Sequence, residues 1–202
     1  MPQESSPSRA ALDLARRLGV LRLRDARKQG IHPETIRRLV SAGTLIKVGR
    51  GMYAPAESDP SEHLDLAHAA VRVPQGIVCL LSALNYHGIG TQMPHEVWMM
   101  IDRRAHRPRV EEPPMRFVLG SGASLTEGIE TVVIDRRSVR IFNPAKTVVD
   151  CFRYRRHVGL DVALEALRGA LQDRRCTPAE IGHYAQEGRV GSVMRPYLEA
   201  TA

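Results

Sequence analysis

The chain has 202 residues, of which 43% are apolar and 25% charged, values typical of a globular protein. It contains no run of about 18 apolar residues, so we expect no membrane span, and its N-terminus lacks the apolar core of a secretory signal. Three scattered cysteines, Cys79, Cys151 and Cys176, argue against a disulfide framework and favour a reducing, cytoplasmic compartment.

The net charge of +7 is confined to the first quarter of the chain. Residues 1–54 contain 11 Lys and Arg against 4 Asp and Glu, a net charge of +7, whereas residues 55–202 contain 18 of each. A locally basic chain predicts one module for a polyanion and a second module with another task. The plain alternative is a solvated basic face. Aromatic residues make up only 4%, which disfavours single-strand binding by base stacking.

The first 30 residues predict two helices. Apolar residues between 11 and 18 fall on one helical face, with Ser8 as the expected N-cap and Gly19 as the expected end. A second, shorter helix is predicted over 22–29, before a turn at Gly30.

A third helix and a hairpin follow. Pro33 suits a first helical position, and we expect this helix to run to about residue 42. Its buried stripe has the spacing i, i+3, i+4 and consists of Ile36, Leu39 and Val40. Two β-prone runs, 45–48 and 52–54, are separated by Gly49-Arg50-Gly51, a loop typical of a hairpin. This order predicts a winged helix-turn-helix, whose third helix enters the DNA major groove.

The polar side chains of this segment are the candidates for DNA binding. Those at and after the start of the third helix are expected to read bases and are His32, Glu34, Thr35, Arg37, Arg38 and Ser41. Arginine can bind guanine through two hydrogen bonds, and Glu34 is either a negative selector or an i+4 partner of Arg38. In the wing, Lys47 and Arg50 are expected to contact phosphates. The second helix offers either phosphate clamps or plain solvated charge, through Arg22, Arg24, Arg27 and Lys28.

An acidic, turn-rich segment over 55–60 predicts a linker between a domain of residues 1–54 and a domain of residues 61–202. The second domain is expected to mix helices and strands, so the predicted fold class is α+β. Its expected helices are 61–73, 77–87, 145–154, 160–172, one capped by Thr177, and one within 188–199. Its expected strands are 96–102, 115–119, 129–134 and 139–142, the last two joined by a turn over 135–138.

Local sequence marks two of these helix starts clearly. Asn143 is a good N-cap and is followed by Pro144 at the first helical position. Thr177 is followed by proline and, three residues on, by Glu180, which is a capping-box pattern.

Three segments in this order resemble the AbiEi-type antitoxins and transcriptional regulators of type IV toxin–antitoxin systems. They are the run IRRLVSAGTLIKVGRGMYA over 36–54, SALNYHG over 82–88, and NPAKTVVD over 143–150. The resemblance spans about residues 8–200. It implies a bacterial autorepressor that binds repeats in its own promoter, and an antitoxin that counteracts a nucleotidyltransferase-like toxin, with direct contact to that toxin left open.

The matching segments of the second domain supply a possible antitoxin-domain surface, formed by Ser82, Tyr86, His87, Lys146, Thr147 and Asp150. Each residue also has a structural explanation: a helix end packed on a sheet for the first three, an i, i+4 ion pair for Lys146 and Asp150, and core packing for Thr147.

Catalytic patterns are missing from the sequence, so we expect no enzyme, no cofactor and no metal. Gly120-Ser121 is not followed by the Asp-x-Asp pair of a nucleotidyltransferase, and no Gly-x-Ser-x-Gly elbow occurs. His63 and His68 lie about 140° apart on a helix, so they are poorly placed to share a metal.

Two other function classes compete with a repressor that is also an antitoxin. A ligand-responsive winged-helix regulator, with an effector site in residues 61–202, also explains the charge distribution. An enzyme with a DNA-targeting domain is the third class.

Overall fold

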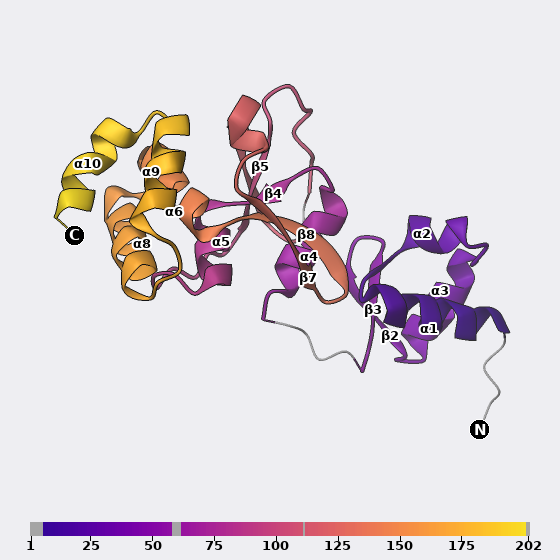
Figure 1. The fold of residues 1–202 in the computed structure, drawn as a ribbon. Helices are drawn as coiled ribbons and strands as arrows, with labels where there is room; N and C mark the ends of the chain where they lie inside the picture. Colours follow the sequence, from indigo (N-terminus) through magenta and orange to yellow (C-terminus); the bar gives the residue numbers. More distant parts are fainter. Residues whose placement is uncertain (1–5, 58–61, 111, 201–202) are drawn as a thin grey trace.

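The computed structural model describes residues 6–57, 62–110 and 112–200, and its elements follow one another in three groups (Figure 1). The N-terminal part forms a small group of helices with a hairpin, the middle part forms a sheet, and the C-terminal part forms a second group of helices. No helix among these residues is long and apolar enough to cross a bilayer.

The N-terminal group is a winged helix-turn-helix. Its elements are α1 Ser6–Leu18, β1 Leu21–Arg22, α2 Leu23–Lys28, α3 Pro33–Ser41, β2 Leu45–Gly49 and β3 Met52–Pro55. The three strands are antiparallel in the order β1-β3-β2. Apolar faces of α1 and α3 meet in one core with Leu21 and Leu45, and Ile36 is fully buried there. The predicted helix-helix-helix-hairpin order is therefore confirmed, and β1 is an element that the sequence did not reveal.

One predicted cap is wrong. The first helix begins at Ser6, so Ser8 lies inside it and is buried rather than serving as the N-cap. Gly19 does end α1, with a φ of +67° that favours glycine.

A mixed five-stranded sheet, in the order β6-β5-β4-β8-β7, forms the middle of the molecule. Its strands are β4 Ile77–Val78, β5 Val97–Asp102, β6 Met115–Gly120, β7 Ile129–Ile134 and β8 Arg137–Phe142. The helices of this region are α4 Leu64–Arg72, α5 Leu80–His87 and the short 3-10 turn η1 Gly122–Leu125. β5 pairs parallel with β6 and antiparallel with β4, and β4 pairs parallel with β8.

Both faces of the sheet are covered. Successive side chains of β5 alternate between faces, so Val97 and Met99 pack with α4, whereas Trp98 and Met100 pack with the C-terminal helices. This double burial explains why the strand is almost continuously apolar.

Two sequence expectations fail in this region. The predicted helix over 77–87 is in fact strand β4 followed by α5, whose first residue, Leu80, has a positive φ of 48°. A short buried strand and a buried helix turn are equally apolar, so periodicity cannot separate them. The β7–β8 turn is also tighter than predicted, because only Asp135 and Arg136 have positive φ values and β8 begins at Arg137.

The C-terminal group contains α6 Pro144–Arg153, α7 Arg155–Val158, α8 Leu160–Gln172, α9 Pro178–Glu187 and α10 Gly191–Glu199. Both predicted caps are confirmed: Asn143 accepts from the Lys146 N–H at 2.8 Å, and Thr177 forms the capping box with Glu180. α6 is central, because it packs against α5, α8 and α9. The short helix α7 was not predicted.

The winged helix packs against α4 and the β7–β8 turn. Val20 and Met52 of the winged helix form a small apolar cluster with Val71 of α4. Gly19 lies so close to the carbonyl oxygen of Asp135 that a Cβ on Gly19 would be 2.1 Å from it. We call this contact zone the junction.

The predicted division into residues 1–54 and 61–202 stays a prediction. Pro55, the first residue of the predicted linker 55–60, is the last residue of β3. Residues 58–60 of that linker and residue 61 lie outside the described residues.

Candidate nucleic-acid interface

The third helix presents a polar face to solvent. Its start is fixed by His32, whose Nδ1 accepts the backbone N–H of Glu34 at 3.2 Å, and by Pro33 at the first helical position. Glu34, Arg37 and Arg38 are exposed, as are the remaining candidates His32 and Ser41. The helix therefore offers cations, hydrogen-bond donors and acceptors on the face opposite its apolar stripe.

Glu34 pairs with Arg37 rather than with Arg38. Arg37 Nη1 donates to Glu34 Oε2 at 2.9 Å, and the two side chains are 75% and 58% exposed. The expected i+4 pair with Arg38 is wrong; Arg38 instead reaches back to the Ser8 hydroxyl at 3.5 Å.

Thr35 differs from the other candidates on this helix, because it is only 5% exposed. It precedes Leu39 by four residues, which places both side chains on the buried face. Its predicted contact to DNA is therefore wrong for this conformation.

The wing is held at its tip by the second part of the chain. Lys47 and Arg50 are exposed, as expected of phosphate-contacting cations. The backbone carbonyl of Arg50 accepts a hydrogen bond from Arg72 Nη2 of α4 at 2.6 Å. The hairpin is thus fixed in position by a residue that lies outside the winged helix.

The basic residues of the α2 region divide into two groups. Arg24, Arg27 and Lys28 lie on α2 and are exposed. Arg22 lies before that helix, in β1, and is only 9% exposed. Its placement on the second helix and the alternative of a plain solvated charge are therefore wrong, whereas the alternative of a phosphate clamp stays a prediction. Arg22 Nη2 has no hydrogen-bond partner among the described residues.

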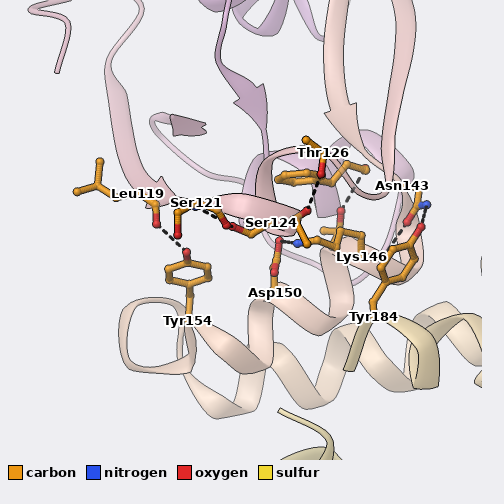
Figure 2. Close-up of polar contacts among 12 residues, drawn as sticks. Leu119, Ser121, Ser124, Thr126, Asn143, Lys146, Asp150, Tyr154 and Tyr184 are labelled. Atoms are coloured by element: carbon orange, nitrogen blue, oxygen red, sulfur yellow. Dashed lines mark hydrogen bonds and ion pairs between the residues drawn. The ribbon is translucent and has the colours of Figure 1, made fainter. Parts of the chain in front are cut away.

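Three candidates from the C-terminal part, all on α6, are buried. Figure 2 shows two of them, Lys146 and Asp150, beneath the segment that connects β6 to β7. Lys146 and Asp150 form an ion pair along α6, and their side chains are 6% and 1% exposed. Thr147 donates from Oγ1 to the Phe142 carbonyl at 3.2 Å. The predicted surface role of these three residues is wrong; the predicted i, i+4 pair is confirmed.

The residues around the Lys146–Asp150 pair connect α6 to the segment after β6. Figure 2 shows α6 below the loop that carries Ser121 and Ser124. Tyr154 donates from its hydroxyl to the Leu119 carbonyl at 3.0 Å. Burial raises the pKa of the Asp150 carboxyl, and the Lys146 ammonium opposes that shift. Asp150 Oδ1 has no partner among the described residues, so the carboxylate depends on Lys146 for compensation.

The remaining candidates connect α5 to the sheet. Ser82 is 2% exposed, and its Oγ accepts the Trp98 N–H at 2.9 Å, so it is not a surface residue. His87 is half-buried and donates from Nε2 to the Phe142 carbonyl at 2.8 Å. Burial lowers the pKa of the His87 imidazole, although this hydrogen bond opposes the shift. Tyr86 is half-buried against the ring of His63, with the ring centres 5.0 Å apart.

Within residues 6–57, 62–110 and 112–200, no group of three or more His, Cys, Asp or Glu side chains is placed to hold a metal ion. The three cysteines are buried, free thiols. Burial raises the pKa of each of these thiols, to about 11 for Cys176, which keeps them protonated near neutral pH.

Comparisons with known proteins agree with this geometry. Residues 9–56 match the family model described as "Transcriptional regulator, AbiEi antitoxin". A search of curated proteins finds no match. Among solved structures, the chain is similar to the crystal structure of the RV2827C protein from Mycobacterium tuberculosis, with 15% identity, a TM-score of 0.62, and coverage of 99% of this chain and 83% of that chain. At this identity, the likeness shows a shared fold.

The family that the N-terminal segment matches is regulatory rather than catalytic. The matched residues cover most of α1 and all of α2, α3 and the hairpin, and they include all of the candidates on α3 and in the wing. The sequence resemblance is therefore confirmed for this segment: residues 9–56 form a winged helix-turn-helix and match the model of the AbiEi antitoxin and transcriptional-regulator family.

Proposed function

We propose that the protein is a sequence-specific DNA-binding autorepressor, and that it acts in the cytoplasm as the antitoxin of a type IV system whose toxin is nucleotidyltransferase-like. The observation that carries the DNA-binding half is the exposed polar face of α3, in a domain that matches a transcriptional-regulator family. The excess positive charge of residues 1–54 supports the same conclusion.

In this mechanism α3 enters the major groove of duplex DNA, and promoter occupancy blocks transcription. Arg37 and Arg38 bind base edges, and His32 and Ser41 contact bases or phosphates near the two ends of the helix. On binding DNA, Arg37 can release its ion-pair partner Glu34 and form hydrogen bonds with a guanine instead. An exposed ion pair contributes about 0.2–1 kcal/mol, whereas a bidentate arginine–guanine contact discriminates between bases by about 1–3 kcal/mol.

The exposed cations outside α3 supply affinity rather than sequence preference. Lys47 and Arg50 of the wing, together with the exposed residues of α2, bind the phosphate backbone in this proposal. Each such contact adds a salt-dependent contribution that is the same for every sequence.

Fluorescence anisotropy tests the DNA half. Purified protein is titrated into a labelled duplex of its own upstream promoter and into a scrambled duplex, each at two salt concentrations. Arg37→Gln combined with Arg38→Gln should lower affinity for the promoter duplex more than for the scrambled one. Lys47→Gln should lower both equally and reduce the salt slope by about 0.9.

Arg168→Gln is the matched control, because Arg168 is an exposed arginine on α8, in the C-terminal group of helices. Equal affinity of the wild-type protein for both duplexes would refute sequence-specific repression. An Arg37→Gln, Arg38→Gln variant that binds like Arg168→Gln would refute the role of α3.

Growth rescue tests the antitoxin half. A nucleotidyltransferase-like toxin from the same operon is expressed with wild-type protein or with the Arg37→Gln, Arg38→Gln variant. If neutralisation depends on the second part of the chain, both should restore growth, although only the wild type represses the promoter. Failure of the wild-type protein to restore growth would refute the antitoxin role and leave the DNA-binding role intact.

A second candidate function is a ligand-responsive regulator. It is favoured by a hollow of about 610 Å³ beside the exposed Met93, whose other lining residues include Trp98, Arg116 and His157. The Arg116 guanidinium lies over the buried Trp98 ring, 4.5 Å from its centre, and pairs with Glu96 at 3.2 Å, so an anionic ligand would meet this guanidinium in competition with Glu96. A thermal-shift screen of small carboxylates and phosphates, with Arg116→Gln as the negative control, tests this function.

A further inference from the structure

Four arginines converge on an open pocket at the junction. The pocket has a volume of about 360 Å³ and is lined by Arg22, Leu23, Arg24, Arg27, Gly51 and Arg72. These residues come from β1, α2, the tip of the wing and the end of α4. Since one water occupies about 30 Å³ in the liquid, the pocket has room for a tetrahedral oxyanion and several waters.

In two of the four guanidinium groups, one nitrogen atom is buried and has no hydrogen-bond partner among the described residues. Arg22 is 9% exposed, lines the pocket, and has no partner at Nη2 among the described residues. Arg72 uses Nη2 for the Arg50 carbonyl, but its buried Nε also has none. A buried cationic donor without an acceptor is destabilising, so these atoms indicate an acceptor that binds from outside the chain.

The charge of the pocket selects an anion. None of its lining residues is acidic. Two carboxylates lie nearby: Asp25 Oδ1 is 3.7 Å from Arg24 Nε, and Glu112 and Arg72 both approach Gly49. Four guanidinium groups and no carboxylate line the pocket, which leaves a positive potential there. Guanidinium groups bind phosphate oxygens through paired hydrogen bonds.

The pocket is held in shape by backbone contacts that do not require a ligand. The Leu23 N–H donates to the Gly51 carbonyl at 2.9 Å, which ties the start of α2 to the wing. Gly51 has a φ of +69°, a conformation that glycine adopts without strain. The Arg72 hydrogen bond to the Arg50 carbonyl fixes the wing to α4 on the opposite side.

We propose that this pocket is a phosphate-binding site shared between the winged helix and α4, with Arg72 as a ligand-binding residue outside the matched segment 9–56. The phosphate group comes either from the DNA backbone or from a free phosphorylated molecule. For the DNA source the inference rests on the proposed function; for the free source it is independent of it. In both cases one bound phosphate links the DNA-binding part to the remainder of the chain.

Isothermal titration calorimetry of the full chain with inorganic phosphate, against chloride at equal ionic strength, tests the site directly. We expect saturable binding by the wild type, at least tenfold weaker binding by Arg27→Gln and by Arg72→Gln, and no change in Arg168→Gln. Arg27 is exposed, and only its backbone carbonyl forms a hydrogen bond with the other described residues, so Arg27→Gln keeps the test valid if Arg72→Gln loosens the junction.

A DNA titration of the same variants, in phosphate-free buffer, identifies the source. Lower duplex affinity and a smaller salt slope in Arg27→Gln and Arg72→Gln assign the DNA backbone. Saturable phosphate binding with unchanged duplex affinity assigns a free phosphorylated molecule. If the wild-type protein binds phosphate but no DNA, the assignment is the same, and only the proposed function is refuted. The inference is overturned if phosphate gives no saturable heat and both variants bind duplex DNA like Arg168→Gln.

Discussion

Replacing one member of the buried pair Lys146–Asp150 should destabilise the fold, whereas replacing both members with apolar residues should leave its stability nearly unchanged. Asp150→Ala leaves the Lys146 ammonium in the core, where its side chain is only 6% exposed. Breaking a buried pair in this way typically costs about 3–5 kcal/mol, because one charge stays without compensation. We expect the free energy of unfolding to fall by about that amount, and Lys146→Met to act similarly because it leaves the Asp150 carboxylate.

The double variant Lys146→Met, Asp150→Leu removes both charges and fills the space with apolar side chains. Such replacements are often neutral or stabilising by about 1–4 kcal/mol, since no ion remains to be desolvated. Lys146 Nζ also lies 4.5 Å from the centre of the Phe142 ring, and this contact is lost with the charge. We therefore expect the double variant to unfold within about 1 kcal/mol of the wild type, far from the sum of the single effects.

Guanidinium chloride denaturation, followed by circular dichroism, measures these differences. Glu96→Gln is the matched control, because it removes a carboxylate that is only half-buried and lies 3.2 Å from Arg116, a pair expected to contribute under about 1 kcal/mol. The argument would be refuted if Asp150→Ala cost no more than Glu96→Gln, or if the double variant were less stable than both single variants. Affinity for promoter DNA should stay unchanged in the folded double variant.

Three further changes test the junction, a buried histidine and a helix cap. Gly19→Ala should lower the unfolding free energy by more than about 1–2 kcal/mol, because its φ is positive and its Cβ would meet the Asp135 carbonyl; a normal denaturation midpoint would contradict this packing. Burial lowers the pKa of the His68 imidazole, so below pH 6.5 the unfolded chain binds a proton that the folded chain does not, and stability should fall between pH 7 and 5.5. His68→Leu should flatten that part of the stability curve measured by denaturation at several pH values, and an unchanged slope would refute the assignment. Asn143→Ala should cost about 1–2 kcal/mol through loss of its cap on the Lys146 N–H, which thermal unfolding would report; retention of the wild-type midpoint would contradict a capping role.

Local chemistry determined the helix ends and the hairpins that the sequence predicted correctly. Asn143 and Thr177 each satisfy N–H groups within three or four residues, so the signal and its effect lie in the same short segment. The wing was predictable for the same reason: Gly49-Arg50-Gly51 interrupts two β-prone runs, and the strands that it joins pair with each other.

Elements that depend on distant partners were not predictable. Ile77 and Val78 form a strand because β5 and β8 lie on either side of them, and an apolar run by itself fits a helix equally well. β1 is likewise a strand only because β3 is beside it.

The candidate site shows the same division. The sequence identified the basic quarter of the chain and the α3 residues whose exposed positions follow from helical spacing, such as Arg37 and Arg38. It did not reveal that Arg22 is buried, or that Arg72, 50 positions further along the chain, lines the same pocket. Charge and periodicity are properties of a segment and can be counted along the chain, whereas burial and the meeting of distant side chains depend on how the segments pack, which only the tertiary structure decides.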